Sequence, residues 1–134
     1  MSAVLNDLKT ALVSWLQTLP ELSGFTFADR PGPPSARPTV MLGAAAMRPW
    51  STDTMVGADC DWTLTLLTET GSFQTVQAAA SAIQAGFRSA SIAPVGAVTL
   101  AHRVTSVTID HDSAQDTERA VLRLSLLADF GDDL

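Results

Sequence analysis

Hydrophobic side chains recur at helical spacing in two stretches of the chain. Leucines and a tryptophan three or four residues apart predict a helix over Ser2–Leu19, which Pro20 ends. Ser72 is a suitable N-cap for a second helix from about Phe73 to Arg88. Its predicted buried stripe consists of Val76, Ala79, Ala80, Ile83 and Phe87. Each helix has one apolar face, so each must pack on a sheet or on another helix.

Apolar and polar side chains alternate elsewhere in the chain, as they do in half-buried strands. Strands are predicted at Phe25–Ala28, Thr39–Met47, Ala58–Thr68, Val98–Ile109 and Thr117–Asp129. The alternation changes phase within the fourth of these, which predicts a β-bulge near Thr105. Asp110–Asp116 is polar and is predicted to be the hairpin connection before the last strand.

The order of these elements is helix, short strand, two-stranded ribbon, helix and hairpin. This order predicts an α+β fold, in which a mostly antiparallel sheet of four to five strands has two helices packed on one face. The 134 residues are expected to form a single domain, 1–134, which is long enough to bury a core without a disulfide or a metal.

Apolar side chains also occur where the predicted ribbon turns, in the polar connector 48–57. A loop this polar at its centre should lie on the surface, so its apolar side chains need either the core of the domain or a partner. Two interpretations stay open: the loop folds back and packs Trp50 on its own sheet, or it docks on another subunit, because Trp and Met are common at interfaces. The candidate interface residues are Met47, Arg48, Trp50, Met55 and Val56.

The charge of the chain argues against several classes of partner. Eight basic residues against fourteen acidic ones give a net charge of −6, which does not suit a protein that wraps nucleic acid, although it suits a channel through which DNA slides. No signal peptide and no membrane-spanning stretch are expected. Cys60 is the only cysteine, so no internal disulfide and no cysteine-based zinc site can form.

Few side chains suit catalysis. His111, between Asp110 and Asp112, could be a general base or a metal ligand, but the predicted turn favours a solvated loop. His102 is expected to be a partly buried, hydrogen-bonded imidazole, and Cys60 a small core residue.

Charged side chains on the strands are expected to be surface groups. Asp59 and Asp61 share the polar face of one strand and could pair as acid and base, although two solvated carboxylates are common. Arginines on the last hairpin could form a positive stripe opposite Asp129, Glu118 or the carboxylates of a neighbouring subunit, although surface pairing within the domain contributes little energy. These arginines are Arg103, Arg119 and Arg123. Phosphate-binding glycine motifs are absent, and no catalytic residue, cofactor or metal is expected.

Several local strings, in this order, resemble one protein family. A leucine-rich helix leads into a proline-rich loop, and Pro38–Gly43 (PTVMLG) then fits the pattern P-x-V-x-L-G. A variable loop, an alternating strand, a helix over Gly71–Arg88 and a hairpin follow. The chain thus resembles the small tail completion or tail terminator proteins of long-tailed phages and of phage-like gene transfer agents.

This resemblance implies a virion protein that is not an enzyme. Such proteins form a hexameric ring that caps the tail tube and joins it to the connector of the head, and the genome passes through the lumen. The implied partners are copies of the chain itself, the tail tube protein and the head connector or stopper protein, with transient passage of DNA and no membrane. The implied location is the head–tail junction of the virion, assembled in the cytoplasm of a bacterial host. The alternative function is a small-molecule-binding α+β module in which His102 or His111 contacts a ligand.

Overall fold

The computed structural model describes residues 2–28, 38–51, 56–69, 73–90, 92, 98–113 and 117–131. The helices are α1 (Ser2–Leu16), a 3₁₀ helix η1 (Pro20–Leu22) and α2 (Phe73–Phe87). The strands are β1 (Thr26–Ala28), β2 (Thr39–Ser51), β3 (Val56–Glu69), β4 (Val98–Asp112) and β5 (Thr117–Gly131).

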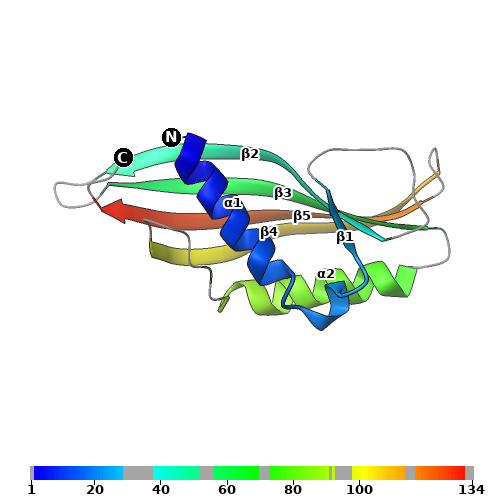
Figure 1. The fold of residues 1–134 in the computed structure, drawn as a ribbon. Coiled ribbons are helices and arrows are strands. Elements are labelled where there is room, and N and C mark those ends of the chain that lie inside the picture. Colours follow the sequence, from blue (N-terminus) through cyan, green and yellow to red (C-terminus); the bar gives the residue numbers. More distant parts are fainter. Residues whose placement is uncertain are drawn as a thin grey trace.

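The strands form one five-stranded sheet in the order β1-β2-β3-β5-β4. β1 runs parallel to β2, and each of the other neighbouring pairs is antiparallel (Figure 1). The predicted α+β class with a mostly antiparallel sheet is therefore confirmed.

Both helices pack on the same face of this sheet, where their apolar stripes join the strands in one core. The stripe of α2 is the predicted one, and α1 contributes Leu8, Leu12 and Leu16. The sheet contributes alternate residues of its two central strands, each at most 2% exposed: Cys60, Trp62, Leu64, Leu66, Ala120, Leu122, Leu124, Leu126 and Ala128. The opposite face carries no described helix and is called the open face below.

The ribbon of β2 and β3 is longer than the sequence pattern predicts. The prediction of a connector over 48–57 is wrong at both ends, because β2 continues to Ser51 and β3 begins at Val56. Arg48 lies opposite Asp59, and Trp50 lies opposite Gly57. Pro49 is tolerated here because β1 reaches only as far as Met41, which leaves the rest of β2 at the edge of the sheet.

The last hairpin also differs from the prediction at its turn. Asp110, His111 and Asp112 belong to β4 and pair with β5, so the prediction that they lie in a turn is wrong. The predicted bulge is confirmed, since the register shifts between Val104 and Ser106. A second bulge, which the pattern did not predict, shifts the register between Thr99 and Ala101.

The first helix ends at Leu16, three residues earlier than predicted. The N–H of Thr18 bonds to the carbonyl of Trp15, a tighter turn that leads the chain into η1, where Pro20 is the first residue. A proline disfavours helical backbone at the residue before it, which explains the early end.

Candidate functional site

The predicted interface residues lie at the far end of the ribbon. Met47 is half-buried, packs against the core and lies opposite Cys60. Arg48 is exposed on the open face. Trp50 and Val56 are in the paired parts of β2 and β3, but their side chains, like all of Met55, lie outside the described residues. The two interpretations of Trp50 therefore both stay predictions.

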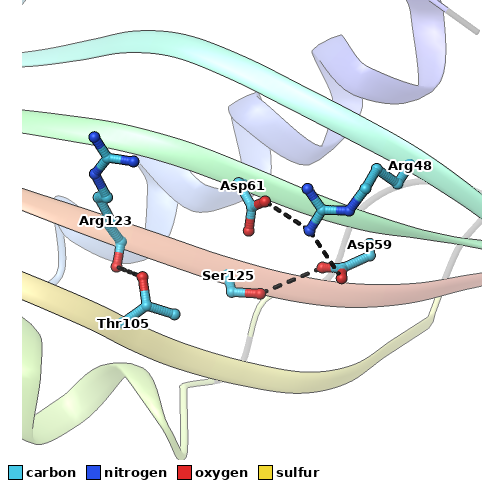
Figure 2. A network of polar contacts seen from close by, with 6 residues as sticks. All are labelled: Arg48, Asp59, Asp61, Thr105, Arg123 and Ser125. Atoms are coloured by element: carbon cyan, nitrogen blue, oxygen red, sulfur yellow. Dashed lines mark hydrogen bonds and ion pairs between the residues drawn. The ribbon is translucent and has the colours of Figure 1, made fainter.

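Arg48 links two carboxylates of the neighbouring strand across the open face. Its Nη2 lies 3.1 Å from Oδ2 of Asp59 and 2.8 Å from Oδ2 of Asp61, as Figure 2 shows. The hydroxyl of Ser125 on β5 donates to the other oxygen of Asp59 at 3.3 Å. Hydrogen bonds to Asp59 and Asp61 raise the pKa of the Arg48 guanidinium. The two carboxylates are therefore partners of an arginine, an arrangement that does not favour an acid–base pair.

A shallow hollow of about 460 Å³ surrounds this group on the open face. It spans four strands, because Ala46, Arg103 and Arg123 line it together with the aspartates. Thr105, at the bulge of β4, donates to the backbone carbonyl of Arg123 at 3.3 Å (Figure 2). The hollow is thus a polar surface with both signs of charge, and such a surface suits contact with another macromolecule better than enclosure of a small molecule.

The expected positive stripe forms differently from the prediction. Arg119 makes a two-pronged contact with Asp110, at 3.0 and 2.9 Å, and this hydrogen bonding lowers the pKa of Asp110. Glu118 was expected opposite these arginines, but it lies on the helix-covered face. There its Oε1 is 3.1 Å from Nδ1 of His111. Alternation along β5 places Glu118 and Arg119 on opposite faces of the sheet.

His102 is partly buried, as predicted, and lies beside α2. Its ring centroid is 5.4 Å from that of Phe87. Burial lowers the pKa of His102, and a hydrogen bond with the backbone of Phe87 opposes that shift. Its Nε2 is buried without a hydrogen-bond partner among the described residues, so the prediction of a fully satisfied imidazole is only half right. A hollow of about 600 Å³, which Gln84 and Arg88 help to line, adjoins it.

Cys60 is completely buried, as expected of a core residue. Desolvation, with a smaller effect of Asp59 and Asp61, raises the pKa of its thiol to about 11. A thiol that is rarely ionised is a poor nucleophile. Among the described residues, no group of three or more His, Cys, Asp or Glu could hold a metal ion.

The open face is polar, and neither outer edge of the sheet carries a further described strand. The model of the family "Tail completion protein gp17" matches residues 10–129. The chain belongs to the tail completion protein family. It is therefore a structural protein of a phage tail, as the resemblance seen in the sequence implied.

The fold of this tail completion protein also occurs in a solved virion. A chain of the structure described as the virion of native gene transfer agent (GTA) particle superposes with a TM-score of 0.80. The two share 20% sequence identity over 96% of this chain and 99% of the other. Comparison with curated proteins finds no match. No helix among the described residues of the tail completion protein is long and apolar enough to cross a membrane.

Proposed function

We propose that this tail completion protein forms a homo-oligomeric ring of six copies that caps the finished tail tube and joins it to the connector of the head. DNA passes through the lumen of this ring. The protein acts at the head–tail junction of the virion, after assembly in the cytoplasm of the bacterial host, and it performs no catalysis. The observation that carries the proposal is the family match over residues 10–129.

The charge of the chain supports passage of DNA through the ring. A subunit with net charge −6 offers little attraction to phosphates, and affinity for DNA comes mostly from neutralising them. Arg48, on the described part of the ribbon, is paired with the carboxylates of Asp59 and Asp61, and this pairing reduces its attraction for a passing phosphate.

The far end of the ribbon supplies a contact to the neighbouring subunit or to the tail tube. Met47 and Arg48 lie there on opposite faces of β2, and Trp50, Met55 and Val56 continue the same segment. The helix-covered face of this segment therefore offers an apolar side chain and the open face a charged one, and both Met and Arg are enriched in interfaces.

Native mass spectrometry and electron microscopy of the purified protein, with and without tail tubes, test this function. The expected result is a closed ring and protein bound at the ends of the tubes. A chain that remains monomeric at all concentrations and never binds a tube end would overturn the proposal.

Replacement of Trp50 tests the ribbon contact separately. Trp50→Ala is expected to weaken ring or tube assembly more than it lowers the stability of the monomer, because hot-spot tryptophans act mainly at interfaces. Phe73→Ala, at an exposed aromatic residue of α2, is the control. Equal losses of assembly and stability in Trp50→Ala would favour the alternative in which Trp50 packs on its own sheet.

A small-molecule-binding module is the second candidate, because His102 lines the hollow of about 600 Å³ and its buried Nε2 has no hydrogen-bond partner in the described part of the chain. A ligand at a hundred times its Kd should stabilise the fold by about 2.7 kcal/mol. A thermal shift screen with a metabolite set therefore separates the two candidates, and His102→Gln should abolish any shift that depends on this hollow.

A further inference from the structure

The sheet has two outer edges that carry no described strand. β1 covers β2 only along Thr39–Met41, so the rest of β2 has β3 on one side and no described strand on the other. β4 is the last described strand on the opposite side and pairs with β5 alone, except at the two bulge positions, Leu100 and Thr105. The free N–H and C=O groups of an edge strand form a template on which another strand can pair.

Each edge also leaves apolar side chains of the helix-covered face half-buried. On β4 these are Val104, Val107 and Ile109, and on β2 it is Met47. The neighbouring positions of β5, Leu122 among them, are at most 1% exposed. A further strand at either edge would cover these side chains and extend the core, which is favourable in proportion to the apolar area removed from water.

The directions of the strands allow β2 of one copy of the chain to pair with the open edge of β4 in another copy. Because β2, β3, β5 and β4 alternate in direction, β4 runs opposite to β2. A second copy in the same orientation would therefore place its β2 antiparallel to β4, as in the rest of the sheet. Two different surfaces of one chain that complement each other make a head-to-tail contact, and such contacts form a ring when the rotation from copy to copy closes.

We propose that β4 of one subunit pairs edge to edge with β2 of the next subunit, so that the sheet continues from copy to copy. This inference rests on the proposed ring and names the two surfaces that build it. Met47 of the neighbour's β2 would then lie on the helix-covered face beside Val107 and Ile109 of β4, whose side chains are half-buried.

The irregular positions of both strands define where pairing can occur. The bulges of β4 interrupt it before Ala101 and at Thr105, which leaves Ser106–Asp112 regular. On β2, the shift after Leu42 and the missing N–H of Pro49 leave Ala45–Arg48 as the regular segment. Bulges and prolines keep edge strands from pairing indiscriminately, so the contact is restricted to these two segments.

Cysteine cross-linking between two separately made variants tests this pairing. Ala46, Ser106 and Thr108 are exposed and lie on the open face of their strands, so cysteine there should leave the fold intact. Ala46→Cys is mixed with Ser106→Cys or with Thr108→Cys under ring-forming conditions and oxidised. Gln77→Cys, on the exposed side of α2, is the matched control partner, and the native Cys60 is buried.

The expected result is a cross-linked dimer in at least one β2–β4 mixture and in neither variant alone. Its yield should exceed that with Gln77→Cys by about tenfold or more, because a formed contact holds two thiols at an effective concentration on the order of mM. A ring that gives no β2–β4 cross-link, or a cross-link of Ala46→Cys with itself, would overturn the pairing and leave the ring standing. Mixed dimers without a closed ring would support the pairing and overturn the ring, and a strict monomer would overturn both.

Discussion

Replacing Phe87 by alanine would remove the side chain that joins both helices to the sheet. Phe87 is fully buried, and its ring centroid lies 5.6 Å from that of Trp15 on α1 and 5.4 Å from that of His102 on β4. Truncation of a buried phenylalanine to alanine costs about 3–5 kcal/mol. Two aromatic contacts, each contributing about 0.5–1.5 kcal/mol beyond area, place this site in the upper half of that range.

Phe73 offers a matched control on the same helix. It is of the same residue type but is 46% exposed, and substitutions at such surface positions usually change stability by no more than about 0.5 kcal/mol. Phe87→Leu, which keeps most of the apolar volume, should lie between the two alanine variants. Urea unfolding followed by tryptophan fluorescence and by circular dichroism gives the free energies of unfolding of all three variants.

The free energy of unfolding that Phe87→Ala is expected to lose is a large fraction of the roughly 5–15 kcal/mol of a typical domain. The variant should therefore fold, but with only a small remaining stability. A loss below about 1 kcal/mol would show that the helices do not share this core. Equal losses at Phe73 and Phe87 would equally refute the packing of α2 described above.

The pKa values of two buried groups give further predictions. Burial lowers the pKa of His102, so the unfolded chain binds its proton more readily; the contribution of His102 to stability should be constant above about pH 6.5 and fall as the pH drops below it. His102→Gln should flatten this fall in urea midpoints measured against pH, and a rise in stability on acidification would contradict the sign. Since the pKa of Cys60 is raised to about 11, alkylation at pH 8 followed by mass spectrometry should be more than about 100-fold slower in the folded protein than in urea. Equal rates would show that the thiol is exposed.

The features that could be predicted best from the sequence are those that follow from side-chain alternation and helical spacing. The stripe of α2 and the bulge at Thr105 followed from the pattern because each buried position leaves an apolar residue at its own place in the chain. The ends of β2 and β4 were missed, because residues such as Pro49 and His111 are poor signals of a strand. Both lie in strands because the hairpins continue past them, with Pro49 opposite Ala58 and His111 opposite Glu118, and the apolar–polar pattern does not record where a hairpin stops pairing.

The contact of Arg48 with Asp59 and Asp61 could not be predicted for a related reason. It depends on the register shift between Leu42 and Ala45. Without this extra residue, Arg48 would lie opposite Ala58 and point into the helix-covered face, since a shift of one residue exchanges the two faces of a strand. The sequence gives no local sign of the shift, apart from the small residues at 43–46.

The order of the strands also determines how the chain can fold. β5 lies between β3 and β4, and the register joins Glu69 directly to Thr117, so α2 and β4 lie within the loop that this pairing closes. The centre of the sheet cannot form from neighbours in sequence, and such non-local pairing slows folding relative to a helical protein of equal size. Until β5 pairs with β3, one edge of β3 is unpaired, and its apolar residues, Trp62 and Leu64 among them, can associate with other copies of the chain. The strand order that builds a continuous core therefore makes the chain prone to aggregate when it is expressed at a high level. Expression at a lower temperature should increase the yield of soluble subunits.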